Sequence, residues 1–453
     1  MQPYKKYKPT GLEWLSQIPE HWEVKKLKYA ATVQPSNVDK KSVEGEQQVL
    51  LCNYMDVYRN EFIDDSISFM KATASDEQIE KFALKNGDVL ITKDSETPED
   101  IAVPALVIYE QENLICGYHL AQIRAQDGLI GPYLFRLFQC KKFNTNFEKA
   151  ANGITRYGLG VDAIKDVEIV LPPLEEQEAI ADYLNTKTAQ IDQLIINKRK
   201  LIALLKDERI ALINEAVTKG TNHNVKMKSS GVDWLDNIPQ HWELKKLKYI
   251  VSKIGSGVTP SGGANVYVKQ GIPLLRSQNI YFDGLYLDDV AYITDEIHNS
   301  MSGSKVQPGD VLLNITGGSI GRCFYYDGTL GEANVNQHVC IVRPNHLILT
   351  KYLYYLLYST LGQLQIEILQ TGANREGLNF EQLKNFLFSV PKTQEQAQII
   401  RFIEIETSKI DYTITRIEKE IELMQEYRSA LISEVVTGQV KIVHKAATEP
   451  VLA

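Results

Sequence analysis

The sequence predicts a mixed α/β protein with two tandem copies of one domain, each followed by a long helix. The two helices are expected to pair as an antiparallel coiled coil about a pseudo-twofold axis. Residues 11–30 and 231–250 are identical at 13 of 20 positions. Three later pairs of segments repeat at an offset of 219, namely 119–124 with 338–343, 156–159 with 375–378, and 211–220 with 430–439. A period near 220 residues is too long for a solenoid and indicates a duplicated domain with its connector.

Each connector is predicted to be one long helix. The two connectors open with a proline and a Glu-Gln pair, at Pro173 and Pro391. Proline is tolerated at a helix start because its missing N–H would be unpaired there, and early acids suit the positive end of the helix dipole. We therefore divide the chain into domain 1–172, helix 173–220, domain 221–391, helix 392–440 and a disordered tail 441–453.

The two helices carry the same heptad stripe. Apolar residues alternate at spacings of four and three over three heptads, which is typical of a coiled-coil seam. The predicted helix-pairing residues are Ile191, Ile195, Ile202, Leu205, Arg209, Leu212, Ile410, Ile414, Ile417, Ile421, Met424, Arg428 and Leu431. A charge at the equivalent seam positions Arg209 and Arg428 costs stability but can fix the register of the two helices. The competing interpretation is two helices that each pack on their own domain.

The domains mix short strands with helices. Strands are predicted at 88–92 and 310–314, after the turn signals Asn86-Gly87 and Pro308-Gly309. The aromatic segments 131–140 and 350–359 have the spacing of helices that face a core. Outside these shared features the two domains differ widely in sequence, as expected of two modules that bind different ligands.

Composition excludes several classes of protein. No 18-residue apolar run occurs and the N-terminus has no apolar signal region, so we expect a cytoplasmic protein without membrane contact. The five cysteines form no CxxC pair, which favours reduced thiols over zinc ligands. The net charge of −8 is concentrated partly in the helices: 174–220 has eight acids against seven bases, and 391–440 has nine against six. Acidic helices leave DNA binding by the domains possible.

Together, the duplicated motifs resemble the DNA-specificity subunit of a type I restriction-modification system over nearly the full chain. The residues that carry the resemblance are the two IPxHWxxKKLKY motifs at 18–29 and 238–249, the segment GSGVTP at 255–260, the Gly-Asp-Val-Leu strands at Gly87 and Gly309, and the two Pro–Glu-Gln helices.

The resemblance implies two target-recognition domains that each read one half of an interrupted sequence in double-stranded DNA. It also implies that the helices dock modification subunits, which methylate adenine, and through them ATP-driven restriction subunits. S-adenosylmethionine, ATP and Mg²⁺ are then expected on those partners, with no cofactor in this chain.

No catalytic motif is present in the sequence. A GxxxxGK[ST] loop, an HExxH helix and the Asn/Asp-Pro-Pro-aromatic motif of adenine methyltransferases are all missing. Residues 255–263 lack the lysine of a nucleotide-binding loop, so we interpret them as a DNA-facing loop. His21 and His241 are interpreted as packing residues, because neither has a second metal ligand nearby. The chain is therefore predicted to be non-catalytic. The alternatives are a coiled-coil assembly protein with two protein-binding domains and a single-chain nuclease.

Candidate DNA contacts are polar residues in loops after the predicted strands. Bases are read by Arg, Lys, Asn and Gln, and phosphates by basic and hydroxyl groups. The candidates are Lys93, Asp94, Ser95, Arg156, Tyr157, Ser256, Thr259, Arg276, Gln278, Asn279, Thr316, Ser319, Arg322, Asn374 and Arg375. The competing interpretation of each is a solvated loop residue. No catalytic or metal-binding residue is predicted.

Overall fold

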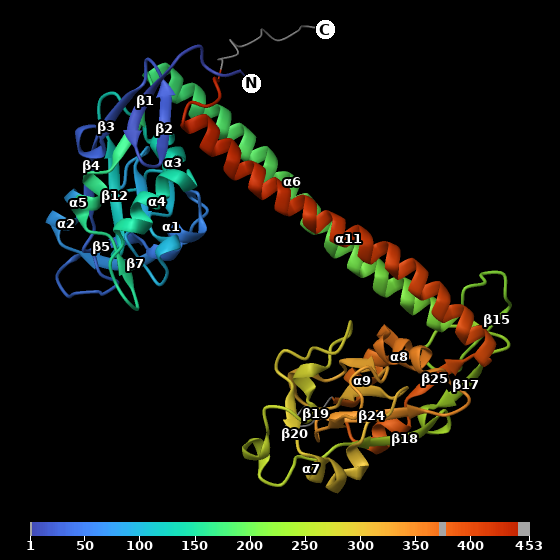
Figure 1. Ribbon diagram of the computed structural model, residues 1–453. Coiled ribbons are helices and arrows are strands. Elements are labelled where there is room, and N and C mark those ends of the chain that lie inside the picture. Colours follow the sequence, from blue (N-terminus) through green and yellow to red (C-terminus); the bar gives the residue numbers. More distant parts are fainter. Residues whose placement is uncertain (1, 371–376, 443–453) are drawn as a thin grey trace, which may run out of the picture. The chain divides into compact units, whose positions relative to one another are not determined.

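The computed structural model describes residues 2–370 and 377–442 and divides the chain into two compact units. The first unit comprises Met1–Lys198 with Glu418–Ala453, and the second comprises Arg199–Ile417. Each unit holds one mixed α/β domain together with part of each long helix, α6 (Leu174–Lys219) and α11 (Thr393–Val436) (Figure 1).

The domain of the first unit has two sheets. The larger has the order β4 (Ala31–Pro35), β12 (Leu120–Ala125), β8 (Val89–Thr92), β10 (Pro104–Val107), β6 (Phe62–Ile63), and the smaller has the order β11 (Leu114–Cys116), β5 (Gln47–Cys52), β7 (Met70–Ala74). Three two-stranded ladders join β1 (Tyr7–Leu12) to β2 (Leu15–Pro19), β3 (Glu23–Lys26) to β14 (Glu168–Leu171), and β9 (Asp94–Ser95) to β13 (Tyr157–Gly158). Its helices are α1 (Tyr54–Arg59), α2 (Asp76–Phe82), α3 (Gly131–Phe138), α4 (Lys141–Ala150) and α5 (Val161–Lys165).

Within the described residues, the domain of the second unit repeats the core of this topology, with one strand fewer in the larger sheet and one two-stranded ladder fewer. Its larger sheet has the order β18 (Val251–Ser256), β24 (Val339–Pro344), β21 (Val311–Asn314), β22 (Cys323–Tyr325), and its smaller sheet the order β20 (Ala291–Ile293), β19 (Ile272–Leu275), β23 (Asn334–Val335). Two-stranded ladders join β15 (Met227–Lys228) to β16 (Ile238–Pro239) and β17 (Glu243–Lys246) to β25 (Leu387–Val390). Its helices are α7 (Asp295–Ser300), α8 (Thr350–Tyr358), α9 (Thr360–Gln370) and α10 (Phe380–Lys384).

The same buried ion pair fixes the start of the central strand in both domains. Asp88 and Asp310 are 1% and 0% exposed, and each carboxylate accepts two hydrogen bonds from one guanidinium on the neighbouring strand. Arg124 donates to Asp88 at 2.7 and 2.7 Å, and Arg343 donates to Asp310 at 2.6 and 2.8 Å. Bidentate geometry of this kind compensates the cost of burying the charges, so the pair locks the strand register.

The duplicated sequence motifs meet where each domain joins its helix. In the first unit the Glu176 carboxylate accepts from the Trp22 indole at 3.0 Å and contacts His21 at 2.6 Å. In the second unit Glu395 contacts Trp242 at 3.0 Å and His241 at 2.8 Å. Both tryptophans are fully buried.

His21 and His241, interpreted as packing residues, have their rings beside Tyr4 and Trp242, with centroids 5.6 and 6.4 Å apart. Their side chains are 46% and 50% exposed. They belong to hydrogen-bonded junctions between the domain and the first turn of the helix, because the helix-start glutamates are within reach of their rings.

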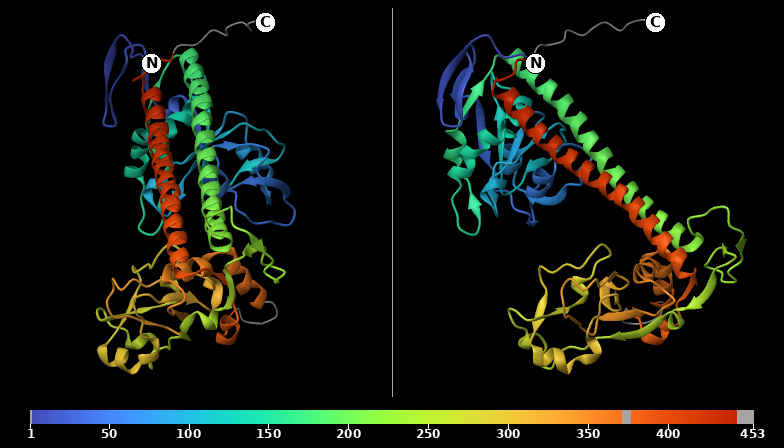
Figure 2. Two further views of the ribbon diagram at one scale, coloured as in Figure 1. Left: turned by 90° about the vertical axis from the view of Figure 1, so that its right-hand side faces the viewer. Right: turned by 45° about the vertical axis from the view of Figure 1, so that its right-hand side comes forward.

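Within each unit the two helices lie side by side and antiparallel, with the start of one beside the end of the other (Figure 2). Equivalent ion pairs cross between them: Arg428 donates to Asp192 at 2.9 Å in the first unit, and Arg209 lies 3.2 Å from Asp411 in the second. The offset of 219 relates both partners of one pair to both partners of the other. The duplication is therefore preserved at the level of single contacts.

The predicted seam residues are the least exposed positions of the stripe. Seven of them are buried, namely Ile191, Ile195, Ile410, Ile414, Ile417, Ile421 and Leu431. Ile202, Leu205, Arg209, Leu212, Met424 and Arg428 are partly buried. Large side chains on the outer faces are open to solvent by contrast, with Leu204 64% and Tyr412 66% exposed.

Candidate nucleic-acid interface

Two candidate loops of the first domain form one surface. Strands β9 and β13 pair antiparallel, with Tyr157 opposite Ser95 and Gly158 opposite Asp94. This ladder brings the loop that contains Lys93 beside the loop that contains Arg156, although they are far apart in the chain. The surface lies beyond the end of β8, because Lys93 directly follows that strand.

A histidine connects the two loops. The His119 ring contacts the Asp94 carboxylate through Nδ1 at 2.7 Å, and Nη2 of Arg156 lies 3.1 Å from its Nε2. An arginine can only donate, so Nε2 of His119 is the acceptor for Arg156 and Nδ1 is the ring atom that faces the Asp94 carboxylate. His119 has a positive φ of 70°, a left-handed conformation that turns its side chain toward both loops. Asp94 and His119 therefore hold Arg156 in place.

A pocket of about 510 Å³ opens beside this line of residues. Its lining residues are Tyr54, Met55, Tyr58, Asp94, Ser95, Glu96, Asp100, Thr155 and Arg156. The rings of Tyr54 and Tyr58 stack with centroids 5.6 Å apart. The nearby Asp100 carboxylate raises the pKa of Tyr58, whose hydroxyl is protonated at neutral pH even at the ordinary tyrosine value. The pocket thus offers donors, acceptors and apolar surface together.

The equivalent place in the second domain has different chemistry. The hydroxyl of Thr316 lies 2.6 Å from Nδ1 of His338, and the Gln337 amide donates to Nε2 of the same ring at 3.0 Å. Thr259 is hydrogen-bonded to Gln337, so the loop after β18 joins the cluster. Thr316 also forms an isolated antiparallel bridge with Gly377. His338 therefore occupies the place of His119, with a hydroxyl partner where the first domain has a carboxylate.

A glycine permits this close approach in the second domain. A Cβ atom at Gly257 would lie 1.7 Å from the Val335 carbonyl oxygen, so no other residue fits there. The loop that contains Ser256 and Thr259 is consequently pressed against the segment before His338. Ser256 itself donates to the carbonyl of Gly257 at 3.2 Å.

Other candidates of the second domain point elsewhere. Arg276 donates to the Asp289 carbonyl at 2.5 Å and Gln278 is hydrogen-bonded to the Asp289 carboxylate. Asn279 is 1% exposed and caps its own turn. The Arg322 guanidinium lies 4.6 Å from the ring centroid of Tyr281.

Arg322 and the remaining candidates of the second domain are placed as follows. Arg322 lines a cavity of about 700 Å³ that α6 and α11 residues also line. Ser319 accepts a hydrogen bond from Asn314 at 3.2 Å. Asn374 and Arg375 lie outside the described residues.

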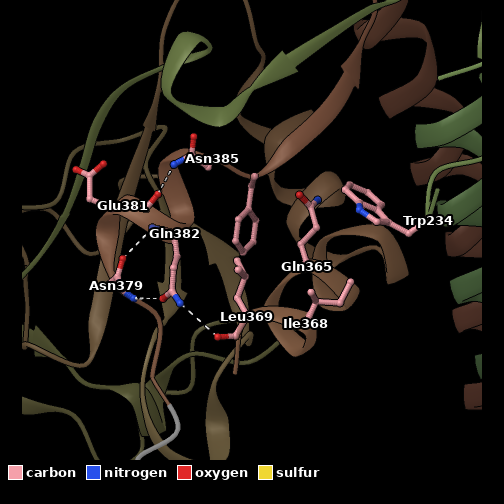
Figure 3. Close-up of a pocket in the computed structure, with 9 residues that line it drawn as sticks. Trp234, Gln365, Ile368, Leu369, Asn379, Glu381, Gln382 and Asn385 are labelled. Carbon is pink, nitrogen blue, oxygen red and sulfur yellow. Dashed lines mark hydrogen bonds between the residues drawn. The ribbon is translucent and has the colours of Figure 1, made fainter. Parts of the chain in front are cut away.

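A second-domain cavity of about 470 Å³ lies beside the helix junction (Figure 3). Its apolar wall includes Trp234, and its polar wall is a reciprocal capping box in which Asn379 and Gln382 bond each other's backbone at 2.9 and 2.8 Å. In the first domain the equivalent Trp14 instead packs on the ring of Phe143 at 5.3 Å. The position equivalent to Phe143 is Gly362, so the second domain has no equivalent aromatic contact.

Sequence reasoning missed the two histidines and the tyrosine pair. His119 and His338 begin one pair of repeated segments, 119–124 and 338–343, which indicates the duplication but not a site. The signal for a site at these histidines is that both recur at the offset of 219 residues and have polar neighbours. Tyr54 and Tyr58 are four residues apart, which is typical of one face of a helix and does not by itself indicate a pocket.

The described residues contain no cluster of three or more His, Cys, Asp or Glu that could hold a metal ion. All five cysteines are buried, and burial raises the pKa of Cys116 and Cys323 well above that of a free thiol. Among residues 2–370 and 377–442 we find no helix with the length and apolarity needed to cross a membrane.

Comparison with known proteins identifies the duplicated unit. The family model described as the type I restriction modification DNA specificity domain matches twice, at residues 19–205 and 239–423. A putative type I restriction enzyme specificity subunit, MjaX, from Methanocaldococcus jannaschii is 24% identical over 94% of this chain and 96% of its own length.

Two solved structures share the fold. One, from a study of complex assembly and conformational transition of the type I R-M system, has a TM-score of 0.68 at 14% identity and covers 93% of this chain and 99% of that chain. The HsdS subunit from Thermoanaerobacter tengcongensis has a TM-score of 0.52 at 15% identity, covering 93% and 98%. With both of its halves matched by the family model, the chain belongs to the type I restriction modification DNA specificity family.

Proposed function

We propose that this chain is the DNA-specificity subunit of a type I restriction-modification complex and reads a bipartite, interrupted target with one domain for each half. The observation that carries the proposal is that the two copies of the specificity domain share the core of their topology but have different polar groups at the same place. Base edges in the major groove differ in their donors and acceptors, so different side chains at one place select different sequences.

In the first domain the proposed reading residues are those of the β9–β13 surface. Arg156 is the base-reading candidate, because a guanidinium can donate two hydrogen bonds to guanine. Asp94 and His119 position it. Lys93 lies 5.9 Å from the ring centroid of Tyr118 and is a candidate for a phosphate contact. Ser95 is 5% exposed and is better suited to holding the ladder than to meeting DNA.

In the second domain the proposed reading residues are Thr259, Thr316 and Gln337, around His338. Arg375 is included by its sequence equivalence with Arg156. Asn279 is left out of the proposal because its amide is consumed inside the domain, with its Nδ2 donating to the Tyr286 carbonyl at 2.8 Å. Arg276 and Gln278 would have to leave Asp289 before they could meet a base.

The outer faces of the helices are proposed to dock the methylating subunits and, through them, the restriction subunits. Large apolar and aromatic side chains are exposed there, which is the surface composition that protein interfaces favour. In the first unit these are Leu194, Ile196, Leu423 and Tyr427, and in the second Leu201, Leu204, Ile405 and Tyr412. A coiled-coil assembly protein that does not bind DNA would need the same exposed helix faces. The two alternatives therefore differ in what the domains bind, which is DNA in one case and protein in the other.

The chemistry is proposed to reside in those partners. The sequence contains no recognisable motif for S-adenosylmethionine, ATP or a catalytic metal, and we expect the purified chain neither to methylate nor to cleave DNA. Adenine methylation by the purified chain supplied with S-adenosylmethionine would contradict this. The chain is expected to act in the cytoplasm, where its DNA target lies.

The test is methylome sequencing of cells that express the chain with its methylating partner. The wild-type chain should give a two-part motif, Arg156→Ala should relax one half and Arg375→Ala the other. Loss of a bidentate contact to guanine should reduce discrimination at that position about 10- to 100-fold. Lys71→Ala, which removes an exposed cation on β7, is the control. Equal effects of both variants on both halves would contradict modular reading, and an assembly protein would give no sequence-specific methylation.

A further inference from the structure

One loop of the first domain is held shut and presents its tip to solvent. The backbone N–H groups of Asn152 and Gly158 donate to each other's carbonyls at 3.1 and 2.9 Å. A Cβ at Gly153, whose φ is +151°, would lie 1.9 Å from the Arg156 carbonyl oxygen. Only glycine therefore allows the chain to turn back this tightly, and the residues that follow it, Ile154, Thr155 and Arg156, are exposed.

Ile154 stands at the tip of this loop. Its side chain is 94% exposed, whereas the other exposed large apolar side chains of the described residues are between 36% and 70% exposed. No part of the described chain covers it. A single exposed apolar residue is ordinary on a protein surface, so its neighbours decide whether it has a role.

Its neighbours form a surface suited to bases rather than to phosphate. The adjacent Thr155 and Arg156 line the pocket that also holds Tyr58. Three carboxylates line the same pocket, those of Asp94, Glu96 and Asp100. Carboxylates repel phosphate but accept hydrogen bonds from cytosine, so a guanidinium, carboxylates and apolar groups together match the edges of base pairs.

We propose that Ile154 is a specificity-determining residue that packs on the C5-methyl group of a thymine next to the base read by Arg156. The thymine methyl is the apolar group that a base pair presents in the major groove, and an apolar side chain is its usual partner. This rests on the proposed function, because it assumes that the loop reads one half of the target. The residue at the equivalent offset in the second domain is Ala373, so the contact is specific to the first half-site.

A chemical double-mutant cycle tests the inference. Each thymine of the first half-site is replaced in turn by deoxyuridine, which removes only the methyl group. Binding is measured for the full chain in complex with its methylating partner. The wild-type complex should lose about fourfold in affinity at one thymine, the value of one buried methyl group. The Ile154→Ala complex should bind weaker to the natural target and be indifferent to that replacement.

Ile108→Ala is the matched control. Ile108 is 47% exposed in the same domain, but it follows the end of β10 that pairs with the start of β8, away from Asp94. Its variant should keep the wild-type response to deoxyuridine. Because Ile154 is solvent-exposed, its replacement leaves the fold unchanged.

Three outcomes overturn the inference: a first half-site without thymine, a wild-type complex indifferent to every replacement, or an Ile154→Ala complex that keeps the wild-type loss. Failure of the proposed function is a separate result, in which the wild-type complex shows no preference for any two-part sequence.

Discussion

The first and second domains are attached to the same pair of helices through different chemistry. In the first unit the side chain of Arg136 is fully buried on α3 and donates to Asn185 on α6 at 2.7 Å. Glu61 joins it to the helices, since its carboxylate lies 3.4 Å from Arg136 and accepts from Arg428 at 2.5 Å. Burial lowers the pKa of Arg136 to about 10, so the guanidinium is still charged at neutral pH.

In the second unit aromatic residues replace this network. The position equivalent to Arg136 is Tyr355, and the position equivalent to Gln139 is Tyr358. Arg209, the counterpart of Arg428, donates to the Tyr358 hydroxyl at 3.0 Å and lies 5.8 Å from the centroid of its ring. The helix arginine is thus shared, whereas the domain side has changed and Asn185 is replaced by Glu404. The two attachments therefore keep one arginine of the helices in common and differ in the domain residues that contact it.

The largest effect is expected from breaking the charged attachment. Glu61→Gln leaves the Arg136 guanidinium buried without a carboxylate, which should destabilise the first unit by about 3 kcal/mol. Hydrogen exchange of the α3 peptides against urea measures this, and the α8 peptides should be unchanged. Glu404→Gln is the control, because Glu404 forms a half-exposed pair with Lys351 and its loss should cost about 0.5 kcal/mol or less. Equal losses for the two variants would contradict a special role of the buried network.

A smaller difference is expected where the two helices end. Gly438 after α11 and Gly220 after α6 have φ values of +69° and +76°, so alanine is strained at both. A Cβ at Gly438 would lie 2.5 Å from the rigid ring of Pro19, whereas at Gly220 the nearest atom is 3.2 Å away on Trp242. We expect Gly438→Ala to cost about 2 to 3 kcal/mol and Gly220→Ala about 1 to 2 kcal/mol. Thermal denaturation of both variants checks the order, and the reverse order would contradict it.

The fold was predictable from the sequence because it depends on repeated patterns. The heptad stripe and the Pro–Glu-Gln starts indicated helices at 173–220 and 392–440, close to the observed α6 and α11. The strands after Gly87 and Gly309 were predicted from turn signals and appear as β8 and β21. Helix and strand periodicities are local, so one sequence suffices to show them.

The candidate site was less predictable because it depends on contacts between distant loops. The pairing of β9 with β13 places Asp94 beside Arg156, and no local pattern indicates that ladder. The burial of Asn279 likewise follows from the turn that surrounds it rather than from its own residue type. Which polar loop residues face solvent is decided by tertiary structure, and a local sequence pattern does not contain that information.

A third experiment compares the two surfaces that are proposed to read DNA. His119→Ala removes the ring that accepts from Arg156 and should weaken reading of the first half-site roughly fivefold, the value of about one hydrogen bond. His338→Ala should affect the second half-site instead. Methylation rates on targets altered in one half measure both. His223→Ala, which changes a histidine that is 76% exposed, is the control. A positional role for His119 would be contradicted if its variant weakened binding to all DNA equally.

The smallest difference concerns the junction at the helix starts. Glu176 accepts from the Tyr4 hydroxyl at 2.7 Å in addition to Trp22 and His21, whereas the position equivalent to Tyr4 in the second repeat is Asn224. Burial opposes ionisation of Glu176, but its three donors outweigh burial and lower its pKa. A lowered carboxyl pKa contributes stability above the unfolded value of about 4.3, and this contribution is lost as pH falls through the folded pKa.

Tyr4→Phe should therefore destabilise the first unit by about 1 kcal/mol at pH 7 and by less as the pH falls below about 4, where Glu176 is protonated with or without the tyrosine. Urea denaturation at both pH values, followed by hydrogen exchange of the first-unit peptides, measures the difference. Tyr7→Phe is the matched control, because the Tyr7 hydroxyl donates to the Gly438 carbonyl at 3.1 Å, which does not titrate. Its loss should be the same at both pH values. If the loss of stability of Tyr4→Phe were also the same at both pH values, the hydroxyl would stabilise the junction without affecting the charge of Glu176. The junctions of the two units would then differ by one hydrogen bond, but their stabilities would depend on pH in the same way.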